Sequence, residues 1–146
     1  SHNPKDIKRI LEPMLENNYD VSIGSRYVEG INVVNWPLSR IILSYTASQY
    51  VQLITRMNIK DSTSGYICYK KSVLESIDLD NIKFTGYAFQ IEMKYKSYLK
   101  NFKIIEVPII FSDRLFGVSK LNGSIISEAI FGVIAMRIKN IFNIKF

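Results

Sequence analysis

A chain of 146 residues is long enough for one domain with a sizeable core, and 47% hydrophobic with 22% charged residues excludes extended disorder. The net charge of +6 favours phosphate-bearing ligands or anionic surfaces, although such a charge also occurs in proteins without these partners. A single cysteine, Cys68, excludes an internal disulfide, and a single histidine, His2, excludes a site built from several histidines.

The predicted elements of the first half alternate between helix and strand. Apolar residues at helical spacing predict a first helix over residues 3–18, and the segment "YDVSIGSRY" (19–27) predicts a strand. Residues 28–37 have the glycine and asparagine content of a loop. Pro37 then opens a long helix with a broad apolar face, predicted over Leu38–Met57.

The alternation continues in the second half. Residues 60–77 predict a turn, a strand and a short helix, and residues 85–101 predict a helix. Residues 102–111 predict a strand that is short or at a sheet edge, because Pro108 lies near its end. A last amphipathic helix is predicted over Ile125–Phe142. The alternating order predicts an α/β fold, and no run reaches the roughly 18 to 20 apolar residues of a membrane-spanning helix.

Basic residues follow two of the predicted strands. Ligands of α/β proteins bind at the carboxyl ends of strands, and Arg26 follows the first strand. A surface or salt-bridging role is the more common one for an arginine at such a position, so it stands as the alternative for Arg26. Arg40 and Ser44 are one turn apart near the start of the long helix, so both side chains can converge on one anion there.

The segment "IIFSDRLFGVSKL" (109–121) combines cations with apolar residues. Arg114 offers a bidentate fork to phosphate oxygens, Lys120 a mobile charge and Ser119 a further donor, while Gly117 permits a tight turn. Between them stand three apolar residues, Leu115, Phe116 and Val118. The combination suits an amphiphile with a phosphate head better than DNA, so we expect no nucleic-acid partner.

Two carboxylates are candidate functional groups. Asp61 begins the turn "DSTSG", where it is either an acid or base or simply a cap of the turn. Glu92 lies on a helix among apolar neighbours, where an unpartnered carboxylate is costly. It is therefore either an acid/base group or a structural hydrogen-bond acceptor.

Six segments in order resemble the polyprenyl-phosphate (dolichol-phosphate) mannosyltransferases, which are family-2 glycosyltransferases. They are "SHNPKDI", "DVSIGSRY", "NWPLSRIILS", "KDSTSGYICYKKSVLE", "GYAFQIEMKY" and "EVPIIFSDRLFGVSKL". The resemblance covers nearly the whole chain but only the second half of that family's catalytic domain. It implies the C-terminal part of a GT-A (Rossmann-like) nucleotide-sugar transferase domain. Residues 1–146 would form its acceptor side, with residues 122–146 either a membrane-interface helix or a helix packed on the core.

The resemblance also implies what lies outside this sequence. Family members begin with a βαβ half that binds the nucleotide and ends in an Asp-x-Asp motif, which holds a divalent metal (Mg or Mn). This chain starts just past that motif, so we expect the metal site just upstream of Ser1 and none within the chain. We therefore expect a fragment of a longer enzyme that is inactive alone.

The implied reaction transfers mannose from GDP-mannose to a polyprenyl (dolichyl) phosphate, with inversion, at the cytoplasmic face of a membrane. The implied catalytic residues are Arg114, Lys120, Asp61 and Glu92. The implied phosphate-binding residues are Arg26, Arg40, Ser44 and Ser119, and Gly30, Asn35 and Trp36 belong to an acceptor loop. Because the acceptor phosphate is already ionised, the carboxylates would position groups rather than abstract a proton. Two alternatives remain: transfer of glucose or N-acetylglucosamine, and a non-catalytic module that binds anionic lipid.

Overall fold

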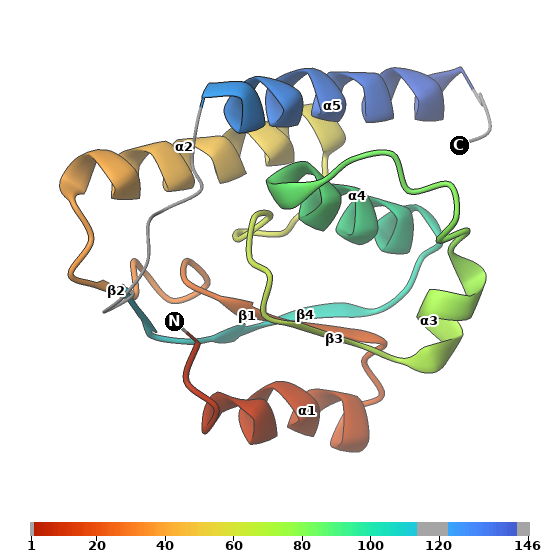
Figure 1. The fold of residues 1–146 in the computed structure, drawn as a ribbon. Helices are drawn as coiled ribbons and strands as arrows, with labels where there is room; N and C mark the ends of the chain where they lie inside the picture. The colour runs from red at the N-terminus through yellow and green to blue at the C-terminus, as the bar shows by residue number, and fades with distance from the viewer. Residues whose placement is uncertain (1, 114–122, 143–146) are drawn as a thin grey trace.

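A three-stranded sheet forms the middle of the structure, a computed structural model that describes residues 2–113 and 123–142. Helix α1 covers one face of the sheet, and α2, α4 and α5 lie on the other side (Figure 1). The elements in chain order are α1 (Asp6–Glu16), β1 (Val21–Ser25), β2 (Val33–Val34), α2 (Leu38–Thr55), β3 (Ile67–Tyr69), α3 (Lys71–Ser76), α4 (Gly86–Leu99), β4 (Ile104–Pro108), β5 (Phe111–Ser112) and α5 (Gly123–Ile141). The alternation predicted from sequence is confirmed as a mixed α/β arrangement.

Strand β1 is the central strand of the order β3-β1-β4. It runs parallel to β4, with Val21 opposite Ile104, and antiparallel to β3. All five residues of β1 are buried because helices cover both faces of the sheet. The carboxyl ends of β1 and β4 therefore meet at one edge, where Arg26 begins the next loop.

Gly24 allows Ile10 and Ile109 to approach one face of the sheet closely. A Cβ atom at this position would lie 3.1 Å from Cδ1 of both Ile10, on α1, and Ile109, which follows β4. A larger residue would have to displace one of these side chains, so the absence of a side chain at position 24 sets the spacing of the layers.

A second, two-stranded sheet corrects the loop predicted over residues 28–37. Val33–Val34 of β2 pair in parallel with Phe111–Ser112 of β5. Two residues are too few for an alternating pattern to appear in the sequence, and the partner strand lies far along the chain. The pairing holds the expected acceptor loop, with Gly30 at φ 90° and Asn35 at φ 60°, beside the segment after β4.

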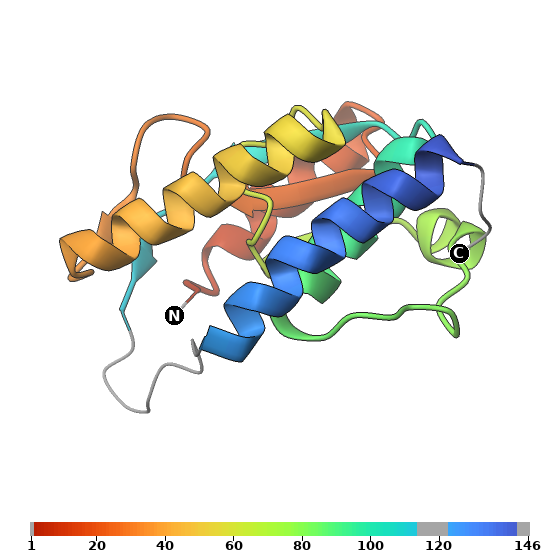
Figure 2. The same ribbon diagram turned by 90° about the horizontal axis from the view of Figure 1, so that it is seen from above.

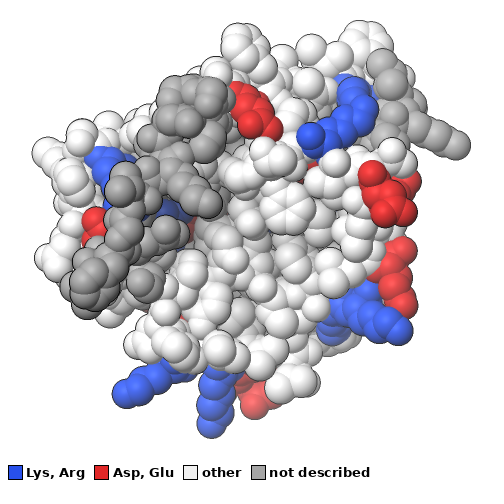
Figure 3. Space-filling model, viewed as in Figure 1, with Lys and Arg blue, Asp and Glu red and all other residues white. Residues whose placement is uncertain are grey.

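Helices α2 and α5 lie side by side above the sheet (Figure 2). The apolar face predicted for α2 is largely on the surface: Ser48, Val51 and Thr55 are its buried residues. The most exposed large apolar side chains of the two helices are Leu38, Ile42, Leu53, Phe131, Ile138 and Ile141. The centre of the face seen in Figure 3 is largely free of charged side chains. No described helix is long and apolar enough to cross a membrane.

Helix α4 is buried over most of its length, in contrast to α2. Its buried residues are Ala88, Ile91, Glu92, Met93, Lys94, Tyr95, Lys96 and Ser97. The sequence pattern of apolar positions did not predict that charged residues of this helix would be enclosed. Each of these charges must therefore find partners inside the protein.

Candidate functional site

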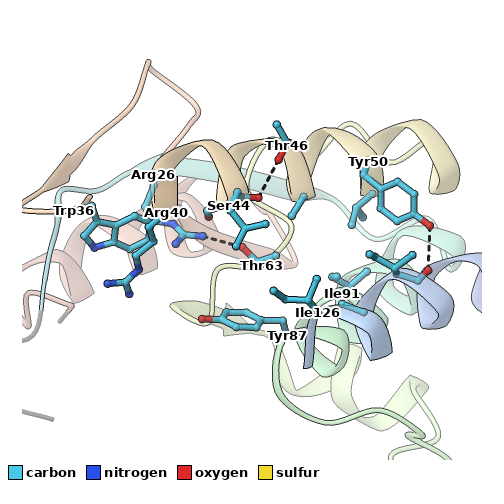
Figure 4. A pocket seen from close by; sticks show the side chains of 15 residues that line it. Arg26, Trp36, Arg40, Ser44, Thr46, Tyr50, Thr63, Tyr87, Ile91 and Ile126 are labelled. Carbon is cyan, nitrogen blue, oxygen red and sulfur yellow. Dashed lines mark hydrogen bonds between the residues drawn. The ribbon is translucent and has the colours of Figure 1, made fainter. Parts of the chain in front are cut away.

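A cavity of about 350 Å³ lies between α2, α4 and α5 (Figure 4). Most of its wall is apolar, with Leu43, Ala47, Val51, Ile91, Ile126, Ala129 and Ile130 among the lining residues. Arg26, Trp36 and Arg40 lie together at one end, and Tyr50 lies toward the other (Figure 4). The cavity thus joins a cationic end to an apolar interior, which matches an amphiphile with an anionic head.

Arg26 is held at this end by Asp61. The guanidinium donates from Nε to Oδ2 at 2.7 Å and from Nη2 to Oδ1 at 2.6 Å, and the Arg26 backbone N–H donates to Oδ2 at 2.9 Å. Nη2 also donates to the Thr63 hydroxyl at 2.9 Å. Burial disfavours the charged guanidinium, but the hydrogen bonds and charge of Asp61 outweigh it, so the pKa of Arg26 is raised. Arg26 therefore has both roles that the sequence left open: it forms a buried salt bridge and it lines the cavity.

Asp61 itself is fully buried and committed to Arg26. Its oxygens accept the bidentate fork of the guanidinium, the strong geometry for this type of pair. These contacts favour a positioning role over proton abstraction. The catalytic assignment of Asp61 stays a prediction.

Aromatic rings surround the two guanidinium groups. The Arg26 Cζ lies 5.2 Å from the ring centroid of Tyr27 and 5.3 Å from that of Trp36. The Arg40 Cζ lies 4.0 Å from the Trp36 centroid, so Trp36 contacts both cations. The indole Nε1 of Trp36 is buried and has no hydrogen-bond acceptor among residues 2–113 and 123–142. It is an unused donor at the cationic end.

Arg40 and Ser44 both line the cavity, one turn apart on α2, as their spacing predicted. Arg40 also forms a partly exposed ion pair with Asp113, with 2.9 Å between Nη1 and Oδ1. The sequence analysis did not identify Asp113 as a partner, because the two residues lie 73 positions apart. Convergence of Arg40 and Ser44 on one anion stays a prediction.

Glu92 is fully buried but does not line the cavity. Its Oε2 accepts from the backbone N–H groups of Lys83 and Phe84 at 3.1 and 3.2 Å, and its Oε1 lies 3.0 Å from Nζ of Lys96. These contacts favour the structural interpretation of Glu92, which fastens residues 83–84 to α4. A catalytic role has no support from this position.

Two charged residues that the sequence analysis missed hold the segment after residue 59. Glu106 on β4 accepts from the N–H groups of Lys60 and Asp61 at 2.7 and 2.8 Å. Lys94 on α4 donates to the carbonyl oxygens of Ser62 and Ser64 at 2.7 Å each. The sequence shows Lys94 only as one lysine within a predicted helix. The spacing of apolar residues cannot by itself distinguish a buried lysine from a surface lysine.

The remaining predicted residues fall in two groups. Gly30 and Asn35 lie in the loop before Trp36, and only Trp36 of these three reaches the cavity. Arg114, Ser119 and Lys120 lie outside the described residues, so their predicted phosphate-binding and catalytic roles stay predictions.

No cluster of three or more histidine, cysteine or carboxylate side chains exists in the described part of the chain. Three carboxylates inside the fold are already engaged: buried Asp61 with Arg26, buried Glu92 with backbone N–H groups, and half-buried Glu106 with Lys60 and Asp61. These residues do not fit a divalent metal. The expected site upstream of Ser1 stays a prediction.

The amino-acid sequence of the chain is similar to those of known proteins. No protein-family profile matches the chain. The chain is 44% identical over 133 residues to a protein of Mycolicibacterium smegmatis named polyprenol monophosphomannose synthase, covering 91% of this chain and 50% of that protein. It is 41% identical over 133 residues to a protein of Micrococcus luteus named undecaprenyl-phosphate mannosyltransferase, covering 91% of this chain and 54% of that protein. The chain spans about half the length of these curated relatives.

Proposed function

We propose, because this chain is homologous over 91% of its length to two polyprenyl-phosphate mannosyltransferases, that it forms the acceptor-binding part of such an enzyme. The observation that carries the proposal is the pair of arginines at one end of an otherwise apolar cavity. The apolar wall accepts the first units of a prenyl chain, and Arg26 and Arg40 face its phosphate.

The chemistry requires cations more than it requires a base. An ionised phosphate oxygen of the acceptor attacks the anomeric carbon of the sugar, and the bond from that carbon to the nucleoside diphosphate breaks. Attack opposite the leaving group inverts the configuration. We propose GDP-mannose as the donor, in line with the mannosyl products that both relatives' names state.

In this reaction Arg26 and Arg40 lower the repulsion between two anionic reactants, and they do so from fixed positions. Asp61 orients Arg26 through Nε and Nη2, and Nη1 of Arg26 makes no hydrogen bond with other described residues. That nitrogen is a donor for a phosphate, and the buried Trp36 Nε1 beside it is a second donor that has no acceptor among the described residues. The described carboxylates do not fit a divalent metal, so the metal ion that the family resemblance implies would be held by residues outside the described part of this chain.

We further propose that α2 and α5 rest in the interface of a membrane. Their exposed apolar side chains would enter the acyl region, as in interfacial helices, and other residues of the same two helices line the cavity. A prenyl phosphate could then pass from the membrane to the cavity without exposing its chain to water. We assign this membrane contact to the cytoplasmic face, where nucleotide sugars are available.

Binding of farnesyl phosphate, with farnesol as the neutral comparison, tests the acceptor assignment. Trp36 is the one tryptophan of this chain, so its fluorescence reports on the cationic end directly. We expect farnesyl phosphate to bind at least tenfold more tightly than farnesol, and Arg40→Gln to remove most of that difference. Arg9→Gln, on α1 across the sheet, is the matched control.

Equal affinity for the alcohol and the phosphate, or an unaltered preference in Arg40→Gln, would contradict the proposal. Binding to any anionic vesicle with no gain from a prenyl phosphate would support the non-catalytic lipid-binding alternative instead. In the complete enzyme, incorporation of labelled mannose into a lipid-extractable product checks the transfer. Competition by nucleotide-activated glucose and N-acetylglucosamine establishes which sugar is used.

A further inference from the structure

Lys94 is a fully buried lysine in the middle of α4 that the proposed reaction does not use. It forms no ion pair with any carboxylate among the described residues. Its Nζ instead donates to two backbone carbonyl oxygens, those of Ser62 and Ser64, at 2.7 Å each. Fully buried lysines are rare, because removing an ammonium group from water costs free energy. The burial of Lys94 therefore requires an explanation, and its two hydrogen bonds point to one.

The segment that Lys94 holds is also the segment that positions Arg26. On its other side Glu106 accepts from the N–H groups of Lys60 and Asp61. A carboxylate therefore binds the N–H groups at the start of the segment, and an ammonium binds the carbonyl groups at its end. Asp61 and Thr63 belong to this segment, and together they bind the guanidinium of Arg26.

We propose that Lys94 is a positioning residue: it holds Ser62 and Ser64 so that Asp61 and Thr63 orient Arg26 at the cationic end of the cavity. This inference rests on the proposed function for its consequence, namely the affinity for a phosphate. Its structural part, the link from Lys94 to Arg26 and Trp36, stands on the contacts alone.

The link has a pH dependence. Burial lowers the pKa of Lys94 from 10.5 to about 7, opposed by the charge of Asp61 and Glu106 and reinforced by that of Arg26. These three groups, from the held segment, the strand β4 and the end of β1, are the charges that act on Lys94. As the pH rises through 7, the ammonium becomes a neutral amine and its hydrogen bonds lose their charge assistance. The segment then holds Arg26 less firmly.

Lys94→Met tests the proposal, because methionine fills a similar volume without donors or a titrating group. Wild-type Trp36 emission is expected to show a transition centred near pH 7, and Lys94→Met is expected to abolish it. At pH 6 the variant should bind farnesyl phosphate about fivefold more weakly than wild type, because it lacks the charge-assisted hydrogen bonds that fix the segment holding Arg26. At pH 8.5 the difference between the two affinities should be smaller than at pH 6, because the neutral amine of wild type keeps only uncharged hydrogen bonds.

Lys96→Met is the matched control, since Lys96 is a buried lysine of the same helix that pairs with Glu92. It is expected to lower stability but to retain the Trp36 transition near pH 7. A wild-type transition that survives in Lys94→Met, or one that disappears equally in Lys96→Met, would overturn the inference.

A second measurement covers the case in which Lys94→Met does not fold. In wild type, amide hydrogen exchange of residues 61–65, corrected for its intrinsic pH dependence, should accelerate above pH 7 relative to the amides of α4. Protection that stays constant across this interval overturns the inference. Failure of the proposed function appears differently: wild type then binds no farnesyl phosphate at any pH, while Trp36 emission still follows Lys94.

Discussion

At the scale of single residues, the cationic end of the cavity consists of two arginines held in different ways. Arg26 is 7% exposed and bound on two nitrogens by a fully buried carboxylate, whereas Arg40 pairs with Asp113 where both side chains are about 30% exposed. Removing one partner of a buried pair strands a charge, while a partly exposed pair adds little. The two arginines should therefore respond differently to loss of their carboxylates.

Asp61→Asn is expected to lower the free energy of unfolding by about 3 kcal/mol, because it leaves the Arg26 guanidinium buried without a counter-charge. Urea denaturation followed by circular dichroism measures the change. Asp80→Asn, at an exposed position on the loop before α4, should change the free energy of unfolding by no more than about 0.5 kcal/mol. Wild-type stability in Asp61→Asn would show that the pair contributes nothing.

Asp113→Asn is expected to tighten binding of farnesyl phosphate, because Asp113 competes with the phosphate for Arg40. Removing one partly screened negative charge should raise the affinity about threefold to fivefold at low ionic strength. Titration of Trp36 fluorescence at two salt concentrations measures both the gain and its screening. Weaker binding in this variant would show that the ion pair orients Arg40 productively.

At the scale of elements, α2 and α5 differ from α4 in what surrounds them. Helix α4 is enclosed, so its charged residues Glu92, Lys94 and Lys96 all have internal partners. Helices α2 and α5 carry large apolar side chains on the surface, among them Leu53 at 77% and Phe131 at 71% exposure. Such a surface favours contact with another apolar phase.

Phe131→Glu is expected to weaken binding to phospholipid vesicles by at least about tenfold, the equivalent of removing one buried aromatic side chain from the acyl region. Leu15→Glu is the matched control, because Leu15 is 81% exposed but lies on α1, across the sheet. Vesicle sedimentation measures both variants. An equal loss in the two would indicate a general effect of charge rather than a membrane face on α5.

At the scale of the whole molecule, one buried charge makes global stability depend on pH. The pKa of Lys94 is 10.5 in an unfolded chain and about 7 in the fold, so between these values the unfolded state binds more protons. The free energy of unfolding therefore rises with pH across this interval. This is compatible with weaker local bonds to Ser62 and Ser64, because deprotonation removes the larger cost of a buried charge.

Comparing the free energies of unfolding of wild type and Lys94→Met isolates the part of the pH dependence that Lys94 causes. We expect the variant to be more stable than wild type near pH 6 and the gap to narrow steadily toward pH 9, since wild type gains stability as Lys94 loses its proton. Urea midpoints at pH 6, 7, 8 and 9 measure the difference. A gap that is constant with pH would mean that Lys94 keeps an ordinary pKa in the fold.

The sequence by itself determined the alternation of helices and strands and the homology to mannosyltransferases, and it singled out Arg26, Arg40 and Ser44, which the structure places on one cavity. These follow from periodicity, from turn chemistry at strand ends and from segments compared in order, all of which are local in the chain. The family resemblance supplied the chemistry that no single motif of the sequence could specify.

The tertiary structure alone decided which charges are paired and which elements meet. Asp61 binds Arg26 across 35 positions, and Val33–Val34 pair with Phe111–Ser112. In both cases the sequence around one partner does not indicate where the other partner lies. The enclosure of Lys94 was likewise decided by the packing around α4. Burial makes the contacts of Asp61, Arg26 and Lys94 strong, because a charge removed from water must find its partner wherever the fold brings one.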